Sequence, residues 1–551
     1  MATDNRPAHM RPGAGEPVRP PWLLRAAGAL LLLLVAGALA SVAFLGNEVQ
    51  SRFGPALTEV PPYPLLIACA AALAGGACAL ARLAALPLER ALAGRRGVCA
   101  LALAGVATFA LQLSLVRAVY GIPGPWDSAY MLEQAALASG NLRDMPAVWH
   151  GWYFSRCPNN IVLTALFTLV YKAAGSLGMG GLVPCMALGA LMVDLGGVAS
   201  AAALARVTGR VTPSVAFLVL YVPLVALSPW VSIPYSDAYG AGFTGLLALM
   251  SAHLLAGDRR RGPAATALLW LAFTLVALLG YEVKPTTLLP WIATLPLSAW
   301  RLAGRGGRRA IRGAAAMLAA SAVAATIVLA LVVPAATRVT GLEGRRDDAK
   351  EIGVAHYFMM GQNDATLGAY SPEDNTYSDS LDASVRRREN LLEGLRRIVR
   401  RGAAGNLSFY AKKAAMAFGD GTFAWTYEAG DGFISPRPGP PSDPISTWLR
   451  RSLYRPAWTE GADMGSYGLV ATVWWLACLA LWAPLALRLA RGGDGAWAAA
   501  MALAAVALGA YLLLFEDRAR YVYFLTPVLV ALSALGACGG MACPEEKRHG
   551  R

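Results

Sequence analysis

Long apolar segments alternate with short polar loops along most of the sequence. Residues 23–45, 314–333 and 521–536 are examples of nearly uninterrupted apolar runs. A run of about 18 or more apolar residues matches a hydrocarbon core roughly 30 Å thick, and in lipid it must be helical because each backbone polar group needs a partner within the segment. The pattern predicts an all-α polytopic membrane protein with about twelve spanning helices. The expected spans are residues 23–45, 64–86, 98–120, 182–205, 212–229, 238–256, 265–283, 285–300, 313–335, 466–488, 496–515 and 521–541.

Basic clusters in the loops predict the orientation of these spans, because Lys and Arg accumulate on the cytoplasmic side. They place both termini in the cytoplasm of a multi-pass protein of the cell (plasma) membrane. The apolar segment Asn160 to Ala174 is then expected to be a re-entrant or juxtamembrane helix on the outer face, since a further span there would invert the later clusters. The clusters are Arg6/Arg11/Arg19, Arg90/Arg95/Arg96, Arg206/Arg210, Arg259/Arg260/Arg261, Arg301/Arg305/Arg308/Arg309/Arg312, Arg488/Arg491 and Lys547/Arg548/Arg551.

Composition supports the membrane class and excludes others. Hydrophobic residues make up 56% of the chain and charged residues 15%, against roughly 25% charged residues in soluble proteins. The net charge of +14 is explained by the loop clusters, so we expect no nucleic-acid partner. The first apolar segment is longer than the roughly 7–15 residues of a signal peptide core, which makes it a span. The eight cysteines show no metal or disulfide spacing.

Several polar residues at the predicted outer face are not required by a membrane span. Asp127 and Asp237 each follow an outer loop, where an N-cap role explains their spacing as well as a functional one. Lys284 lies between two tightly joined spans, where it is expected either to snorkel to headgroups or to bind a phosphate. Asp194 lies near the middle of a span, where a charge is costly and is a functional candidate by default.

The last outer turn reads Glu516-Asp517-Arg518-Ala519-Arg520-Tyr521. Its arginines are the best candidates to grip a lipid phosphate, because a planar guanidinium matches that geometry. Taken together, two acids and several cations converge on one face of the membrane, as a site at the outer interface requires.

The order of these features resembles the GT-C glycosyltransferases, in particular the protein-O-mannosyltransferase and ArnT-like branch. The similar features are a first-loop Asp before a helix that ends in Ser-Gly, a second-loop Asp, a Lys between two spans, and a terminal Glu-x-Arg-x-Arg-Tyr. The stretches 153–160, 234–237 and 356–361 are similar to a Gram-positive bacterial subgroup. The resemblance covers about residues 98–541, and it departs in two ways: two spans precede the family's first, and Ser128 stands where many relatives have a second acid.

The resemblance implies a division of the chain around a catalytic membrane module. The region 336–465 is expected to form a small extracytoplasmic α or α/β region, in which Ser384 to Gly402 reads as a basic amphipathic helix that lies on anionic headgroups or forms a solvated face. The expected parts are a tail (1–22), two extra N-terminal spans (23–97), a GT-C-like transmembrane catalytic module (98–335), the extracytoplasmic region (336–465), C-terminal spans (466–541) and a second tail (542–551).

The resemblance also implies a reaction. A polyprenyl-phosphate sugar would be the donor, and an envelope protein, wall polymer or lipid the acceptor, with membrane lipid around both. Asp127 would be the general base of an inverting transfer. The substrate-binding candidates are Asp237, Lys284, His356, Tyr357, Arg518, Arg520 and Tyr521. No Gly-rich phosphate loop is found, and Ser128 weakens the case for a metal, so we expect no cofactor.

Two alternatives remain open at this point. A lipid or polysaccharide transporter, or flippase, would place polar residues near the membrane midplane and commonly carries internal repeats; only Asp194 fits that position, and no repeat is seen. A non-catalytic envelope-assembly protein would use the region 336–465 to bind a partner.

Overall fold

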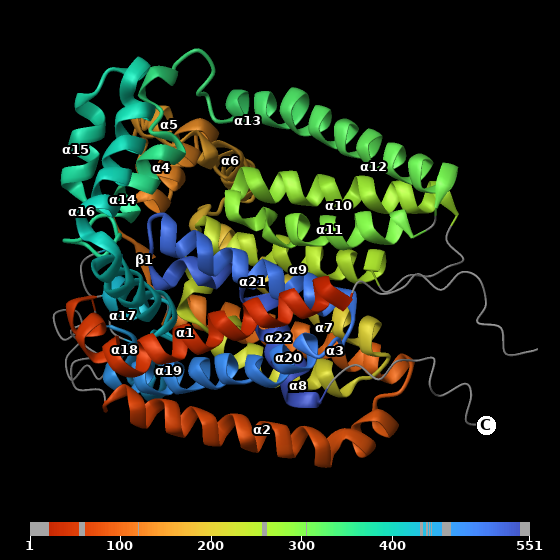
Figure 1. Cartoon of the computed structure of the whole chain (residues 1–551). Helices are drawn as coiled ribbons and strands as arrows, with labels where there is room; N and C mark the ends of the chain where they lie inside the picture. The colour runs from red at the N-terminus through yellow and green to blue at the C-terminus, as the bar shows by residue number, and fades with distance from the viewer. Residues whose placement is uncertain are drawn as a thin grey trace, which may run out of the picture.

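A computed structural model describes residues 21–53, 61–119, 121–255, 262–304, 306–429, 433–436, 439, 441, 443–454 and 464–539. Nearly all of these residues are helical, and Figure 1 shows the long helices lying side by side in one bundle, with a group of shorter helices gathered at one end. The chain is a polytopic all-α membrane protein, as the apolar pattern predicts. Most of both predicted tails lies outside the described residues.

Ten of the described helical segments are long and apolar enough to cross a membrane. Three of them combine two or three elements, because a π-helical turn, a 3-10 turn or a short break interrupts the α-helix. The helices concerned are α1 (Pro21–Phe53), α2 (Tyr63–Ala91), α3 (Arg95–Ala118), α7 (Leu182–Thr208), α9 (Ser236–Leu255), α10 (Pro263–Val283), α12 with η6 and α13 (Gly307–Ile327, Val328–Val332, Val333–Val339), α19 with α20 (Met464–Ala480, Trp482–Ala490), α21 (Ala496–Leu514), and η8 with α22 (Ala519–Leu525, Thr526–Cys538).

Two of the twelve predicted spans are not among these ten segments. Helix α8 (Thr212–Tyr221) and the π-helical turn η3 (Val222–Ala226) form one short apolar helix, and α11 (Leu289–Ala303) has 15 residues. At 1.5 Å per residue, 15 residues reach about 22 Å, less than the roughly 30 Å hydrocarbon core. The physical reason is proline: Pro223 lies in the π turn, and Pro285 begins the 3-10 turn η5 (Pro285–Leu288) before α11.

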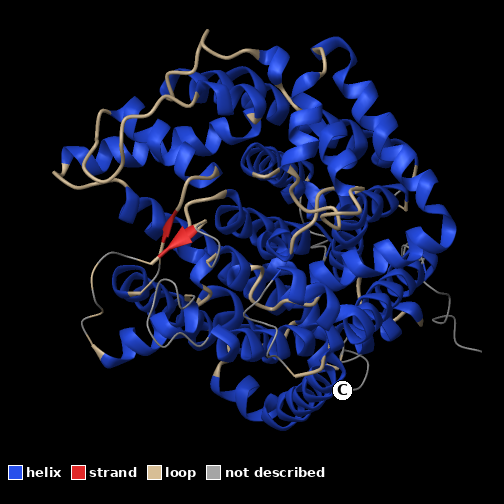
Figure 2. Cartoon of the chain, turned by 90° about the vertical axis from the view of Figure 1, so that its left-hand side faces the viewer, coloured by secondary structure: helices blue, strands red, loops and turns tan. Residues whose placement is uncertain are grey.

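The shorter helices form a cap on one end of the bundle, on the left of Figure 1. We call this the capped end. A single pair of short antiparallel strands, β1 (Ile122–Pro123) and β2 (Ile434–Ser435), joins it to the membrane module (Figure 2). In the described part of the region 336–465, the regular elements other than β2 are helices. The remaining elements are α4 (Asp127–Ser139), α5 (Gly151–Arg156), η2 (Pro158–Asn160), α6 (Ile161–Ser176), η4 (Pro229–Ser232), η7 (Asp348–Lys350), α14 (Gly353–Gly361), α15 (Pro372–Ser380), α16 (Ala383–Phe418), α17 (Trp425–Glu428) and α18 (Pro444–Leu453).

The basic helix expected at 384–402 is the first half of α16, which bends at Gly402, where φ is +63°. Neither a headgroup-binding nor a solvated face explains all its arginines. Arg386 is buried and donates to the backbone carbonyls of its own cap, and Arg397 binds Asp374 through two hydrogen bonds of 2.6 and 2.9 Å. Part of the charge in this helix therefore holds the cap together.

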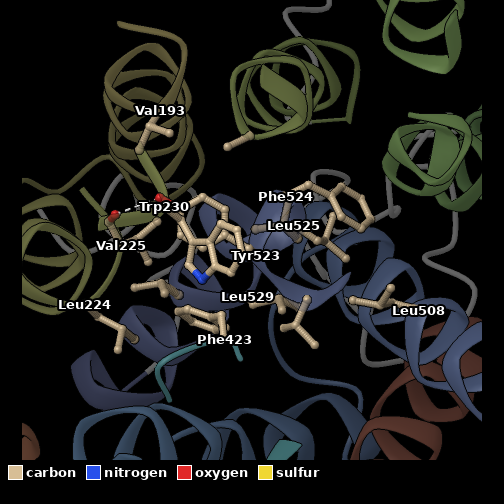
Figure 3. Close-up of a cluster of buried hydrophobic side chains, with 14 of the residues drawn as sticks. Val193, Leu224, Val225, Trp230, Phe423, Leu508, Tyr523, Phe524, Leu525 and Leu529 are labelled. Carbon is tan, nitrogen blue, oxygen red and sulfur yellow. Dashed lines mark hydrogen bonds between the residues drawn. The ribbon is translucent and has the colours of Figure 1, made fainter. Parts of the chain in front are cut away.

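A continuous core of buried aromatic and aliphatic side chains lies beneath the cap (Figure 3). Trp230, Phe423 and Tyr523 come from three distant parts of the sequence and are each almost completely buried. The Tyr523 hydroxyl donates to the Val225 carbonyl (2.9 Å), and the Trp230 indole donates to the Thr422 carbonyl (3.2 Å). These bonds satisfy polar atoms that would otherwise be costly in a dry interior, and they fix the loops above the core.

Helices α7 and α9 approach each other most closely at glycines. A Cβ atom on Gly245 would lie 2.3 Å from the Gly196 carbonyl oxygen, and one on Gly196 would lie 2.4 Å from the Ala241 oxygen. Small residues allow spanning helices to pack backbone to backbone. This contact determines where α9, and with it Asp237, lies relative to α7.

We expect Gly245→Ala to lower the stability of the protein by about 1–3 kcal/mol, because the added methyl group forces α7 and α9 apart. The measurement is the apparent melting temperature of the purified protein in detergent. Gly76→Ala is the matched control, since a Cβ at Gly76 in α2 would meet nothing within 4 Å. Equal melting temperatures for the two variants would show that the close crossing does not limit stability.

Candidate active site at the capped end

Asp127 is held by a backbone framework built from distant segments. It is the first residue of α4, after Trp126 in an extended conformation. The Gly124 amide and the Trp126 indole both donate to the Phe433 carbonyl, at 2.7 Å each, and the hydroxyl of Ser128 donates to the Pro234 carbonyl (2.8 Å). The two loops that carry Asp127 and Asp237 are thus held together by this hydrogen bond.

The Asp127 carboxylate faces tyrosines rather than capping its own helix. The Tyr235 hydroxyl donates to Oδ2 at 2.8 Å, and Tyr153 also hydrogen-bonds this carboxylate. No side-chain cap bond is formed at the start of α4, so the N-cap interpretation is wrong. Burial raises the pKa of Asp127, and the hydrogen bonds from Tyr235 and Tyr153 and the nearby charge of Arg520 oppose that rise.

A chain of ion pairs lies next to Asp127. Lys284 Nζ is 2.9 Å from Asp237 Oδ1, and Asp237 Oδ2 is 3.4 Å from Arg520 Nε. Arg520 continues to Glu428 (2.6 Å), which also lies 3.6 Å from Arg518. Three cations thus alternate with two buried carboxylates in one chain of ion pairs.

Lys284 points into the protein and does not snorkel to headgroups. Its backbone is extended (φ −154°, ψ 113°) between α10 and η5, which turns its side chain toward α9. Its amino group lies 5.0 Å from the ring centroid of Tyr521 and 5.5 Å from that of Phe524. Because the side chain is only 13% exposed, Lys284 contributes its charge to the network around Asp237.

Aromatic rings surround the Arg520 guanidinium. Its central carbon lies 4.9 Å from the ring centroid of Trp126, 5.4 Å from Tyr235 and 5.6 Å from Tyr521. A cation over aromatic faces is stabilised by about 0.5–2 kcal/mol per contact. Trp126 and Tyr235 also flank Asp127, so the same rings position the candidate base and the central cation of the network.

Glu428 is the functional candidate that the sequence did not reveal. It is 2% exposed and pairs with both arginines of the last turn. A tight loop places it there: the Asp420 carboxylate accepts from the amides of Thr422 and Ala424, at 2.8 Å each, and Ala424 has a positive φ of 65°. An acid between Trp-Thr-Tyr and Ala-Gly-Asp is the only sequence signal, and it does not indicate pairing with the last turn.

The last turn is anchored to the cap through its own acids. The Glu516 amide donates to the Tyr357 carbonyl (3.0 Å), and its carboxylate accepts from the Tyr521 hydroxyl (2.8 Å). Burial raises the pKa of Asp517 to about 8, despite the opposing charge of Lys413. The Lys413 amino group donates to the carbonyls of Gly361 and Phe515 and fixes the turn against α14.

The structure brings six of the eight candidate residues, Asp127, Asp237, Lys284, Arg518, Arg520 and Tyr521, into one cluster. Tyr357 also belongs to it, since its side chain hydrogen-bonds Cys157 and interacts electrostatically with Glu516. His356 does not. It is fully buried, and its Nδ1 lies 2.9 Å from the hydroxyl of Ser378 in the cap. Burial lowers the pKa of His356 to about 4, so it is neutral near pH 7. Its expected role in substrate binding stays a prediction.

Asp194 lies outside the cluster as well. Within the bundle, Gln112 donates to its Oδ1 (3.0 Å) and to the carbonyl of Ala226 in the π turn η3 (2.8 Å). The Gln112 side chain on α3 therefore links α3 to Asp194 on α7 and to η3.

One comparison with known proteins identifies a family. A model of a family described as "conserved hypothetical integral membrane protein" matches residues 31–539. The chain belongs to this family. No curated protein and no solved structure matches the chain. The family match extends from the first span to the last, so the two N-terminal spans that precede the resemblance to glycosyltransferases are part of the family's own architecture.

Among the described residues, no group of three or more His, Cys, Asp or Glu side chains is placed to hold a metal ion. The expectation that no cofactor is used stays a prediction.

We expect Glu428→Gln to destabilise the protein by roughly 3 kcal/mol, because it removes one of two buried anions that face three cations. Thermal unfolding in detergent measures the change. Glu343→Gln is the matched control, since Glu343 pairs with Arg338 on the surface, where the two side chains are 63% and 69% exposed. A Glu428→Gln protein as stable as the control would show that Asp237 alone suffices to hold Arg520.

Proposed function

We propose that the protein is a membrane glycosyltransferase that moves a sugar from a polyprenyl-phosphate donor to an envelope acceptor. The observation that supports this most is the position of Asp127: a partly exposed carboxylate beside a network of three cations, Lys284, Arg518 and Arg520. A base next to fixed positive charge suits a displacement in which a proton is removed on one side and an anion leaves on the other.

The proposed step is a direct displacement at the anomeric carbon of the sugar. Asp127 accepts the proton of the acceptor hydroxyl as the acceptor oxygen forms its bond to that carbon. The bond between the anomeric carbon and the phosphate oxygen breaks, and its electron pair stays on the polyprenyl phosphate. Attack opposite to the leaving group inverts the configuration. The proton then passes from Asp127 to water.

The cationic network would stabilise the leaving phosphate. Asp237 and Glu428 hold Arg520 between them, so the guanidinium is in place before any substrate binds. Preorganised charges cost no reorganisation at the moment of reaction.

This function places the capped end outside the cell, where a lipid-linked sugar is presented, and both termini in the cytoplasm of the cell membrane. Two features support that orientation. The cap carries the charged residues of both signs between 336 and 465, and the basic loop residues Arg206, Arg210 and Arg301 lie at the opposite ends of spans from Asp237 and Lys284.

We expect cells that carry Asp127→Asn to accumulate a polyprenyl-phosphate sugar and to lose one envelope glycan, because an amide cannot take the acceptor proton. A positioned base contributes about 10²–10⁴-fold to the rate. Mass spectrometry of extracted lipids and of envelope glycans measures both changes. Asp348→Asn is the control, an acid that is 75% exposed on a turn of the cap.

Both variants are compared with wild type at equal membrane abundance. An Asp127→Asn strain with normal glycans and no lipid-linked sugar would contradict the proposal, and the flippase and envelope-assembly hypotheses would then take precedence.

The Tyr235 hydroxyl predicts a pH effect. Its hydrogen bond lowers the pKa of Asp127, so Tyr235→Phe raises that pKa further. Because a base works only when deprotonated, activity is lost as pH falls through the pKa of Asp127, and in the variant this loss begins at higher pH. The measurement is transfer from a labelled polyprenyl-phosphate sugar in isolated membranes between pH 4 and 8. Superimposable profiles for the two proteins would contradict the role of Asp127 as base.

A further inference from the structure

One face of α4 carries a row of polar and aromatic side chains that leads away from the cationic network. Asp127, Tyr130 and Glu133 are spaced three residues apart, which places them along one side of the helix. Tyr235 donates a hydrogen bond to Asp127, and the Arg520 guanidinium lies over the rings of Tyr235 and Trp126. The candidate base therefore stands between two different environments.

The first component of this row is a cluster of aromatic rings. The Tyr130 ring centroid lies 5.3 Å from those of both Trp152 and Tyr153, and 4.9 Å from that of His150. Tyr153 joins the cluster to the base, since its side chain hydrogen-bonds Asp127. Trp152 is 51% exposed, so the cluster presents an aromatic face to whatever lies next to Asp127.

The second component is a polar pair at the far end of the row. The Glu133 carboxylate, whose side chain is 20% exposed, is hydrogen-bonded to Nε2 of His150. His150 is 5% exposed, and its Nδ1 has no hydrogen-bond partner among the described residues. The buried imidazole therefore holds the partly exposed Glu133 carboxylate in place.

We infer that this row is a carbohydrate-binding subsite for the acceptor; it is formed by Tyr130, Glu133, His150 and Trp152. That the bound sugar is an acceptor rests on the proposed function, whereas the binding of a sugar does not. The carbon-bound hydrogens of a sugar ring pack on an aromatic face, and its hydroxyl groups hydrogen-bond a carboxylate. An acceptor sugar seated on the side of α4 that carries Asp127, Tyr130 and Glu133 would lie beside the candidate base.

Other occupants fit this row less well. A lipid chain has no groups for Glu133 and His150. Aromatic belts at the membrane interface do expose Trp and Tyr, but they give no reason for the Glu133 carboxylate that lies in the same cluster. The acceptor hydroxyl that this row favours is that of a glycan.

The experiment measures the binding of free oligosaccharides to the purified full chain in nanodiscs. Asp127→Asn protein is used as the background, so that no turnover occurs. The probe is a panel of hexose and pentose oligomers of two to six units, followed by saturation-transfer NMR. We expect at least one oligomer to bind, and Trp152→Ala to weaken that binding about tenfold or more. Glu133→Gln, which keeps the aromatic face intact, is a second variant with the same expected direction.

Trp448→Ala is the matched control, since Trp448 on α18 is 63% exposed and lies in the cap. Equal binding by the Trp152→Ala and Trp448→Ala proteins, or no binding by any oligomer of the panel, would overturn the subsite. An unchanged melting temperature in Trp152→Ala shows that the fold is intact. The two proposals can fail separately. If an oligosaccharide binds at this row but Asp127→Asn leaves all envelope glycans unchanged in cells, the subsite stands and the transferase is refuted.

Discussion

The candidate site depends on one arginine that two buried carboxylates hold. Arg520 lies between Asp237 and Glu428, and each of these acids also faces a second cation. Buried ions of this kind are tolerated only when every charge has a partner, because the loss of one partner leaves an uncompensated charge away from water. The positions of α9, η8 and α17, which carry Asp237, Arg520 and Glu428, are therefore tied to one another.

Asp127 adds an asymmetry to this arrangement. Its carboxylate meets tyrosine hydroxyls and has no direct ion pair among the described residues, whereas Asp237 and Glu428 are ion-paired. Burial raises the pKa of Asp127, and a carboxyl that binds a proton more readily than usual is a better acceptor of one during catalysis. Asp127 therefore differs from Asp237 and Glu428 in its hydrogen-bond and ion-pair partners, although all three are carboxylates at the same end of the bundle.

The sequence predicted the class of the fold well, because runs of apolar residues translate directly into helices in lipid. It was less successful where local chemistry interrupts a helix. Pro223 lies in a π turn and Pro285 begins a 3-10 turn, and a hydropathy pattern counts the apolar residues near a proline without recording such a change in helix geometry.

The sequence predicted only part of the candidate site. The order of Asp127, Asp237, Lys284 and the last turn led to residues that the structure brings together. Glu428 was missed because its role comes from contacts made after the chain folds. His356 was misplaced because neighbouring residues on a helix point in different directions: Tyr357 turns toward the site, and His356 turns into the cap.

The location of Arg520 near the end of the chain has a consequence for synthesis and membrane insertion. When α9 and α17 have emerged from the ribosome, the arginine that both Asp237 and Glu428 require has not yet been made. Lys284 can neutralise Asp237 early, because α9 and α10 are neighbours in sequence, but Glu428 has no other described partner than the two arginines of the last turn. Insertion of the hairpin formed by α21 and α22 is therefore the step that supplies the cations for Glu428. A chain truncated before this hairpin would leave the Glu428 carboxylate buried without an ion-pair partner among the described residues.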